Sequence, residues 1–448
     1  MQFRRTDAAV ARNLNPPPWG RGTSTCWWRG TGNLSFSSQC YEVLTSQSCE
    51  SPPLKVAITA RTPPPSKRMV PLPVPRRIAF LFCLCSKAQM PSEPPIHGRG
   101  APSAHVPQRF GLAAREADGD WLDERAAIDG PAPKLRTHVT EEHARTIISY
   151  NQSPDIPFDR SINAYRGCEH GCVYCYARPT HAFHDLSPGL DFETKLFAKP
   201  NAAKLLREAL AKPGYQPAPI AMGTNTDPYQ PIEDRYRITR QVLEICLEVR
   251  HPVTITTKSA RVTRDLDLLE PLAALGLVAV GVSVTSLDPR LSALLEPRAS
   301  SPAKRLDALR QLVAAGVPSH VSVSPVIPSI TDEFIEGILQ EAAARGVRSA
   351  SWIMLRLPHE VAPLFREWLD AHYPDRADKV MHTVQAMRHG KDNDGNFFSR
   401  MKPLGTWADL FRARFRITTK RLGMNEERLK LDSSRFERPS AGGQLRLL

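Results

Sequence analysis

An alternation of two residue patterns constrains the fold of this chain more than any other feature. Between residues 161 and 355, short runs rich in β-branched residues alternate with stretches in which apolar residues recur every three or four positions. Strands in series with helices favour parallel strands joined by right-handed crossovers, and apolar strands fit a sheet covered by helices. The expected strands are 161–167, 219–225, 253–259, 278–286, 320–327 and 349–355.

The helical stretches between these strands have the spacing of helices that pack on a sheet. Leu306, Leu309 and Leu312 form such a stripe. A closed eight-stranded barrel would need two more units, and the alternation fades after residue 360. We therefore expect an α/β fold with a partial (β/α)6 TIM-like barrel, whose functional residues lie at the carboxyl ends of the strands. The expected helices are 239–249, 263–275, 302–316 and 331–346.

The flanking regions differ from this central part in composition. Residues 1–89 are rich in Pro and Ser, lack any period, and hold twelve Lys or Arg against three Asp or Glu. We expect them to be disordered or to lie outside the working protein, with translation starting at Met90. The remaining expected divisions are an irregular segment at 90–150, the barrel at 151–358 and a basic capping region at 359–448.

The chain shows no targeting or membrane signal. MQFRRTDAAVARNLNPPP lacks the apolar core of a signal peptide, and no run of about eighteen apolar residues occurs. We therefore expect a cytoplasmic protein with no membrane partner, in which a disulfide framework is unfavourable. The net charge of +13 arises from both ends, since residues 400–448 hold twelve Lys or Arg against five Asp or Glu.

Three thiols lie within eight residues of RGCEHGCVYCY, just after the first expected strand: Cys168, Cys172 and Cys175. A zinc ion could bind them with His170 as the fourth ligand, but structural zinc sites usually draw on two separated pairs of ligands. A four-iron cluster explains the arrangement better, because three thiolates bind three irons and leave one open to a small molecule. We therefore favour a cluster over zinc.

The spacing Cys168-x3-Cys172-x2-Cys175, with an aromatic residue before the last cysteine, resembles the signature of radical S-adenosylmethionine (radical SAM) enzymes. Four further stretches resemble the branch that contains spore photoproduct lyase, which is often called DNA-repair photolyase-like. The likeness covers about residues 150–355. These stretches are GTNTDPYQPIE (223–233), TTKS (256–259), RDLDLLEPLAALG (264–276) and SVTSLDPRLSALLEPRA (283–299).

This resemblance implies a [4Fe–4S] cluster on the three cysteines and S-adenosylmethionine as the second cofactor. An external donor, flavodoxin-like or ferredoxin-like, would supply the electron that cleaves S-adenosylmethionine, and the resulting radical would abstract hydrogen from a substrate. A lesion in a nucleic-acid base is the expected substrate, and a lyase-like reaction the expected chemistry. The alternatives are modification of an RNA or protein group and, from another class, a zinc-stabilised nucleic-acid-binding module without catalysis.

The resemblance also implies cofactor-binding residues at the strand ends. Tyr174 corresponds to the aromatic position beside the adenine, Lys258 to a donor for the cofactor carboxylate, and Ser283 to a small polar contact. The family's usual Gly-Gly-Glu is absent, and residues 223–225 with Asp227 take its place. Each position also has a structural interpretation: a Pro-containing turn, a solvated lysine, a serine bonded to backbone, or a packed tyrosine. The set is Tyr174, Gly223, Thr224, Asn225, Asp227, Lys258 and Ser283.

Three further features complete the expectations. Cys246 has the spacing of a packed helical residue, so we expect a small core residue and not a hydrogen donor. The basic stretch FRARFRITTKR (411–421) fits nucleic-acid contact and helix packing equally well. The Gly- and Asn-rich stretch 389–401 is expected to close over the barrel mouth. The sequence identifies no catalytic side chain.

Overall fold

A seven-stranded sheet dominates the computed structural model, which describes residues 98–104 and 135–439. The expectations for residues 1–89 lie outside the described residues. The strand order is β10-β9-β8-β7-β6-β3-β2, and all neighbours are parallel except β2 and β3. The six parallel strands lie in sequence order, which confirms the α/β, partial-barrel fold class. The strands are β2 Ile148–Tyr150, β3 Arg160–Ile162, β6 Ile220–Met222, β7 Val253–Thr257, β8 Val278–Ser283, β9 Ser319–Val326 and β10 Ser349–Met354.

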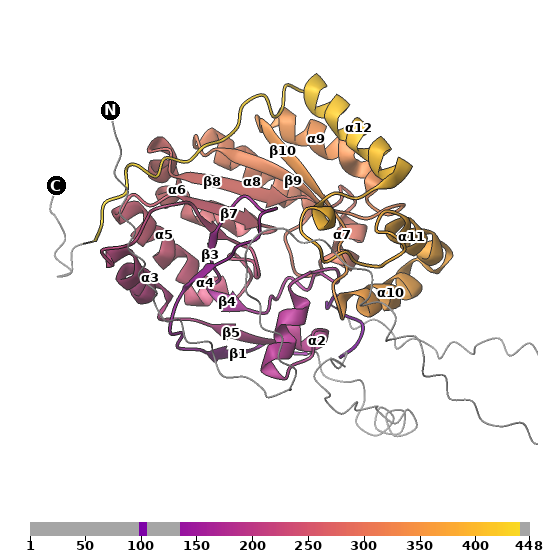
Figure 1. The fold of residues 1–448 in the computed structure, drawn as a ribbon, viewed down its shortest axis with the longest axis horizontal. Helices are drawn as coiled ribbons and strands as arrows, with labels where there is room; N and C mark the ends of the chain where they lie inside the picture. The colour runs from indigo at the N-terminus through magenta and orange to yellow at the C-terminus, as the bar shows by residue number, and fades with distance from the viewer. Residues whose placement is uncertain (1–97, 105–134, 440–448) are drawn as a thin grey trace, which may run out of the picture. The chain divides into compact units, whose positions relative to one another are not determined.

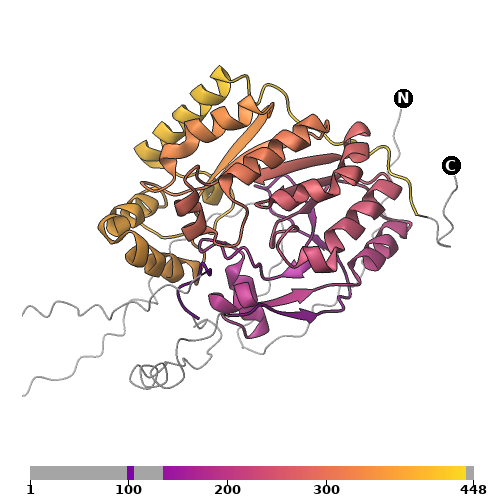
Figure 2. The same cartoon turned by 180° about the vertical axis from the view of Figure 1, so that it is seen from behind.

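A row of helices covers one face of this sheet (Figures 1 and 2). All four expected helical stretches form helices, because their apolar stripes pack on the strands as the spacing predicts. The bounds are α3 Ala202–Ala211, α4 Glu233–Tyr236, α5 Ile238–Glu248, η3 Ala260–Asp265, α6 Leu266–Ala274, α7 Pro289–Leu295, α8 Pro302–Ala314, η4 Asp332–Phe334 and α9 Ile335–Ala344.

The two faces of the sheet differ in chemistry. Val280 and Val282 of β8, like Val321 of β9, belong to the apolar core under the helices. Because side chains alternate along a strand, the intervening residues lie on the other face. There a Cβ on Gly281 would lie 3.7 Å from side-chain atoms of both His320 and Thr256. The inner face therefore carries small and polar side chains, unlike closed barrels, whose interiors are filled by branched apolar residues.

A small second sheet has the order β1-β5-β4 and lies below the main sheet in Figure 1. Its strands come from segments about 30 residues apart. The sequence analysis predicted no strand at β1 or β5, and it placed β4 in the expected strand 161–167. Two short helices accompany it. The bounds are β1 His138–Glu141, β4 Tyr165–Arg166, η2 Arg178–His184, α2 Leu190–Thr194 and β5 Lys195–Ala198.

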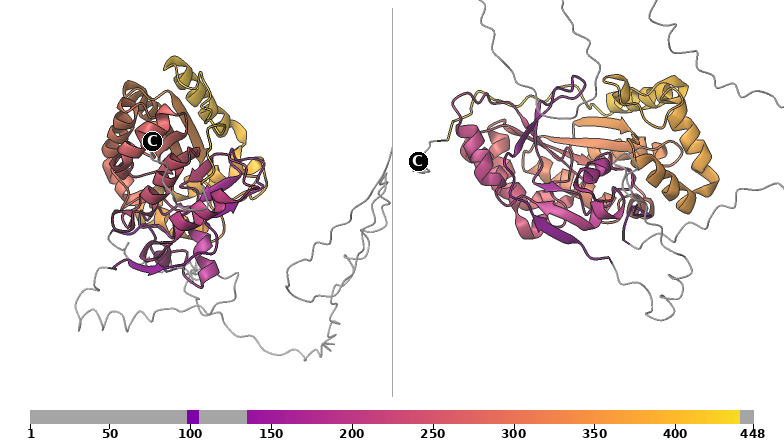
Figure 3. Two further views of the ribbon diagram at one scale, coloured as in Figure 1. Left: turned by 90° about the vertical axis from the view of Figure 1, so that its left-hand side faces the viewer. Right: turned by 60° about the horizontal axis from the view of Figure 1, so that its bottom comes forward.

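Four C-terminal helical elements gather at one end of the main sheet (Figure 3). In the last of them, Phe411 is buried and its ring lies 4.9 Å from that of Trp352. Arg414 binds Glu336 of α9 through two hydrogen bonds of 2.7 Å. Part of the basic stretch 411–421 is therefore used for packing. The elements are α10 Val361–His372, α11 Pro374–Ala386, η5 Ser399–Met401 and α12 Gly405–Arg421.

Residues 422–439, which we call the C-terminal strap, run back along the sheet after α12 (Figure 1). Three backbone N–H groups of the strap donate to carbonyls that lie just before β10, β8 and β7. These bonds join Asn425 to Arg348 at 2.8 Å, Asp432 to Gly276 at 2.9 Å and Glu437 to Val249 at 2.9 Å. The strap thus crosses the amino ends of the strands from β10 to β7. None of the helices in the described part of the chain is long and apolar enough to cross a membrane.

Candidate functional site

The three thiols lie in the loop 167–176, which joins β4 to η2 and which we call the cysteine loop. All three are free, Cys168 and Cys172 are buried, and Cys175 is partly buried. Cys172 packs in an apolar cluster with residues of α7, α10 and α11, and Cys168 packs with Phe192. Cys175 contacts both clusters. The loop therefore lies between two apolar layers that exclude water from the sulfur atoms.

Burial raises the pKa of all three thiols, that of Cys168 most strongly. Metal-binding cysteines are thiolates, so a bound metal centre would have to displace the protons. Among residues 98–104 and 135–439, no three His, Cys, Asp or Glu side chains converge closely enough to hold one metal ion. The donor set itself fits a four-iron cluster, because three thiolates on one loop can bind three irons and leave the fourth open to a small molecule.

The turn after β6 holds the cysteine loop in place. The Gly167 carbonyl accepts hydrogen bonds from the Thr226 hydroxyl at 2.7 Å and from the Gln230 amide at 3.3 Å. The Gln230 side-chain oxygen in turn accepts from the backbone N–H of Glu169 at 2.9 Å. These polar side chains are buried and bonded, so they fix the loop and do not face a ligand.

Asp227 connects this turn to the end of β7. Its Oδ1 accepts from the Thr257 hydroxyl at 2.7 Å, and its Oδ2 accepts from the Lys258 backbone N–H at 2.8 Å. The ring nitrogen Nδ1 of His170 lies 3.3 Å from Oδ2. Burial alone would raise the pKa of this carboxyl, but His170 and the hydrogen bonds hold it below its usual value. Both oxygens are thus already used within the protein, and the role of Asp227 in cofactor binding stays a prediction.

Gly223, Thr224 and Asn225 follow β6 directly. Gly223 has a φ of +88°, and a Cβ there would lie 1.9 Å from the Thr256 carbonyl oxygen, so only glycine fits. The side-chain oxygen Oδ1 of Asn163, just after β3, accepts from the Thr224 hydroxyl at 3.3 Å and from the Asn225 backbone N–H at 3.0 Å. These three residues therefore lie at the carboxyl end of β6, between its neighbours β3 and β7, where cofactor contacts were predicted.

Lys258 and Tyr174 meet on the inner side of the sheet. The Lys258 ammonium lies 5.6 Å from the centre of the Tyr174 ring, 2.9 Å from the Ser324 carbonyl oxygen and 3.2 Å from a carboxylate oxygen of Glu296. The Tyr174 hydroxyl donates to the same oxygen of Glu296. Two of the predicted cofactor residues thus share one partner that the sequence analysis did not single out.

Glu296 is the centre of this network. It is fully buried and paired with the equally buried Arg305. Arg305 also donates to the carbonyl of Ser283 at 3.1 Å, which ties the predicted Ser283 to the network through its backbone. Burial by itself would raise the pKa of Glu296, but Arg305 and Lys258 hold it well below its usual value. Glu296 lies within the stretch 283–299 that carries the family resemblance, and this was the one signal available for it.

A segment far from the thiols in sequence, Gly98–Ala104, lies against the cysteine loop. The Glu193 carboxylate accepts hydrogen bonds from the backbone N–H groups of Gly100 at 3.0 Å and Ala101 at 2.8 Å, and from the buried Arg178. A Cβ on Gly100 would lie 1.6 Å from the carbonyl oxygen of Gly171 in the loop. Two glycine backbones are therefore in direct contact, and no sequence pattern indicated it.

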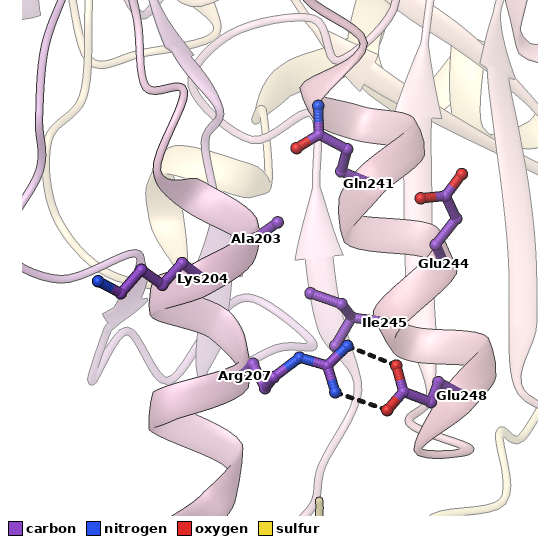
Figure 4. A pocket seen from close by; sticks show the side chains of 7 residues that line it. All are labelled: Ala203, Lys204, Arg207, Gln241, Glu244, Ile245 and Glu248. Atoms are coloured by element: carbon purple, nitrogen blue, oxygen red, sulfur yellow. Dashed lines mark hydrogen bonds and ion pairs between the residues drawn. The ribbon is translucent and has the colours of Figure 1, made fainter. Parts of the chain in front are cut away.

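Two other features lie away from the cysteine loop. Cys246 is completely buried in the core of α5, and burial raises its pKa to about 12, which agrees with the packing interpretation. A surface pocket of about 350 Å3 lies between α3 and α5 in the outer helical layer (Figure 4). The side chains of Arg207 and Glu248 join across it through two hydrogen bonds of 2.5 Å. Neither feature contacts the predicted cofactor residues.

Comparisons with known proteins identify the domain around the cysteine loop. Residues 162–342 match the model of the Radical SAM superfamily. An uncharacterized protein of Mycobacterium tuberculosis is 37% identical over 222 residues, which is 49% of this chain and 65% of that protein. A radical SAM Nalpha-GlyT isomerase of Pseudomonas phage M6 is 26% identical over 214 residues, 47% of this chain and 42% of the isomerase. A solved spore photoproduct lyase variant gives a TM-score of 0.47 at 16% identity, covering 64% of this chain and 80% of the lyase.

Proposed function

We propose that this chain is a radical SAM enzyme, because residues 162–342 match the model of that superfamily, whose members use a [4Fe–4S] cluster and S-adenosylmethionine. Cys168, Cys172 and Cys175 would hold the cluster. The single observation that carries the proposal is the position of three free thiols on one water-excluding loop beside the carboxyl ends of parallel strands.

When bound, the cluster and S-adenosylmethionine would together supply one-electron chemistry that removes a hydrogen atom from the substrate, and the three thiols of the cysteine loop would hold the cluster. The residues of the chain bind, orient and exclude water. Lys258 can offer its ammonium to the cofactor carboxylate, because Glu296 and the Ser324 carbonyl hold it at the inner face of the sheet. Arg305 keeps Glu296 ionised, so the position of Lys258 does not depend on pH near neutrality.

The other predicted contacts surround the same region. Tyr174 would lie near the adenine, and Ser283 near the cofactor on β8. Gly223, Thr224 and Asn225 would offer hydroxyl and amide groups, with Asp227 behind them, to the cofactor ammonium. Since the family's Gly-Gly-Glu is absent, the hydrogen bonds that Thr224 and Asn225 donate to Asn163 Oδ1 support this assignment, because they position both residues. An external electron donor of flavodoxin or ferredoxin type would complete the system.

The proposed substrate is a damaged or modified nucleic-acid base. The likeness of residues 223–233 and 283–299 to the spore photoproduct lyase branch supports it, and so do the small polar side chains on the inner face of the sheet. The exposed basic residues of α12, such as Arg416 and Lys420, offer one surface for phosphates. A modified RNA or protein group is the alternative substrate within the same chemistry.

Purification without oxygen tests the proposed chemistry. We expect a brown protein with about four irons per chain, which dithionite bleaches and which forms 5′-deoxyadenosine from S-adenosylmethionine. A colourless protein that holds one zinc would contradict the proposal and support the zinc-stabilised binding module. Elemental analysis of the iron and zinc content distinguishes the two results directly.

The domain limits are part of the proposal. We place the radical SAM domain at 151–358 and the capping region at 359–448, with 90–150 as an irregular segment before the domain. Residues 1–89 would be dispensable, with Met90 as the native start. A chain that begins at Met90 should form as much 5′-deoxyadenosine as the full chain. A clear loss of product on truncation would show that residues 1–89 contribute.

A further inference from the structure

Arg356 and Arg388, at the carboxyl side of β10, form no ion pair with a carboxylate among the residues that the structure describes. The bonds that the structure gives them go to neutral acceptors: Arg356 donates to the Met401 sulfur at 3.6 Å, and Arg388 to the Leu355 carbonyl at 2.7 Å. In both, the Nε atom is buried and finds no hydrogen-bond acceptor among the described residues. A buried guanidinium nitrogen without an acceptor is unfavourable, so this site can still bind an anionic ligand.

Two acidic groups lie near these arginines. Burial and the charge of Arg356 lower the pKa of Arg388, and the charge of Asp394 partly offsets this. Asp155 binds Arg400 through hydrogen bonds of 2.7 and 2.5 Å, and it also accepts from the backbone N–H of Phe398. Burial and then the positive charge of Arg400 lower the pKa of Arg356, so the guanidinium groups repel one another. This corner of the molecule therefore has an excess of positive charge that an anion would neutralise.

The excess charge lies next to the cysteine loop. The Arg356 guanidinium carbon is 5.6 Å from the centre of the Tyr176 ring, and Tyr176 directly follows Cys175. The Tyr176 hydroxyl donates to the carbonyl of Thr224 at the end of β6. Tyr176 thus reaches from the carboxyl end of β6 to that of β10. An anion bound to Arg356 would therefore lie beside a residue of the cysteine loop.

Exposed aromatic rings lie beside Arg356 and Arg400 and in the segment just before Arg400. Tyr176 is 50% exposed, Phe397 is 53% exposed and Phe398 is 54% exposed. Arg400 lies over the Phe397 ring at 4.9 Å, which holds this ring beside the positive charges. Exposed rings next to arginines suit unpaired bases, which stack on aromatic faces while their phosphates bind the guanidinium groups. An acidic peptide would satisfy the charge but would leave the rings uncovered.

We propose that Arg356, supported by the charge of Arg388, binds a phosphodiester group of a single-stranded or extruded nucleotide whose bases stack on Tyr176, Phe397 and Phe398. This inference rests on the proposed function, because it makes the bound nucleotide the substrate beside the cofactor. Arg388 is 2% exposed and acts behind Arg356 by fixing the Leu355 and Arg400 carbonyls. It thereby connects the end of β10 to the loop 389–401.

Fluorescence anisotropy of a short fluorescein-labelled oligothymidylate with the full-length protein, over a range of salt concentrations, tests this site. We expect Arg356→Ala to weaken binding about tenfold or more and to lower the salt dependence by about one phosphate contact. Arg356→Lys should restore part of the affinity, since it keeps the charge but not the planar fork. Arg310→Ala is the matched control, because Arg310 is an exposed arginine on the outer helix α8.

The opposite results are equally clear. Equal oligonucleotide binding by Arg356→Ala and wild type, with loss in Arg416→Ala, would overturn the site in favour of the α12 surface. A labelled glutamate peptide that binds as tightly as the oligonucleotide would also overturn the nucleotide assignment. Iron content and circular dichroism of each variant show whether it has folded.

The two proposals fail separately. Oligonucleotide binding that depends on Arg356, without 5′-deoxyadenosine formation, would support the phosphate site and refute the radical chemistry. Formation of 5′-deoxyadenosine by a wild-type protein that binds no oligothymidylate would support the radical chemistry and overturn the phosphate site.

Discussion

The two ends of the main sheet use polar groups in opposite ways. At the amino ends, the C-terminal strap satisfies backbone carbonyls with backbone N–H groups, as Asn425, Asp432 and Glu437 do. At the carboxyl ends, side chains bond side chains: Glu296 with Arg305, and Asp227 with Thr257. Backbone hydrogen bonds from the strap occupy polar groups at the amino ends, whereas the side-chain networks at the carboxyl ends include groups that can face a ligand. Substitutions at the carboxyl ends should therefore alter cofactor content and binding, and substitutions at the amino ends should alter stability alone.

The largest expected effect is on the cysteine loop. Replacing Cys168, Cys172 or Cys175 with Ala should remove most of the iron from anaerobically purified protein, because each thiolate would bind one iron of the proposed cluster. Iron analysis and the visible absorbance measure it. Cys246→Ala is the matched control, since that thiol is in the helical core. Full iron retention in any of the three loop variants would contradict its assignment as a ligand.

Glu296→Gln tests whether the carboxyl ends also carry stability. The substitution leaves the buried Arg305 without a counter-charge, which typically lowers the free energy of unfolding by about 3–5 kcal/mol. Urea denaturation of the iron-free protein measures it. The double variant Glu296→Leu with Arg305→Leu should recover much of the loss. A single variant as stable as wild type would show that water reaches this pair.

His251 makes the amino ends sensitive to acid. Burial lowers the pKa of its imidazole to about 4, against about 6.5 in an unfolded chain. Between these values the unfolded chain binds more protons, so the free energy of unfolding decreases as pH falls from 6.5 to 4. His251→Gln should reduce this decrease by up to about 3 kcal/mol. Urea denaturation at pH 7 and pH 4.5 measures it, and identical pH slopes would refute the assignment.

Lys258→Ala should act on the cofactor and not on the cluster. Loss of one charge-assisted contact should weaken S-adenosylmethionine binding about tenfold or more, with iron content close to that of wild type. Isothermal titration under anaerobic conditions gives the dissociation constant, and Lys258→Arg shows how much the charge alone restores. An unchanged constant would remove Lys258 from the cofactor site.

Asn425→Ala should give the smallest effect, at the opposite end of the sheet. Its side chain accepts from the Ala350 backbone N–H at 2.8 Å and donates to the Ala350 carbonyl at 3.0 Å. Their loss should lower the free energy of unfolding by about 1–2 kcal/mol and leave iron content unchanged. Asn425 has a φ of +64°, so Asn425→Gly separates the lost bonds from backbone strain. Loss of iron in either variant would contradict the division between the two ends.

Sequence patterns predicted the elements whose residues recur periodically or lie in one short run of the chain. The six parallel strands follow from alternating residues, and the cysteine loop follows from three thiols in one short run. The burial of Val282 and Val284, opposite to Ser283, also follows from period two. The stretch 411–421 has a composition that fits helix packing and nucleic-acid contact equally well. The contact of Phe411 with Trp352 shows which part of it is packed.

Long-range polar contacts could not be predicted in this way. Arg99 and Glu193 lie 94 positions apart, and no local pattern marks either of them. Glu296 and Arg305 are close in sequence, but a glutamate and an arginine near helices are usually solvated. Their burial depends on how α7 and α8 pack beside β8, which is a property of the assembled sheet. The unpaired Arg356 belongs to the same class.

The contact between Gly100 and Gly171 has a consequence for the evolution of this chain. Gly100 can approach the cysteine loop only while it lacks a side chain, and a Cβ at position 171 would lie 2.8 Å from a carboxylate oxygen of Glu193. The carboxylate at position 193 in turn accepts from the backbone N–H of Gly100. These three positions should therefore covary among homologues. A lineage that acquires a side chain at position 100 should also lose the acidic residue at 193.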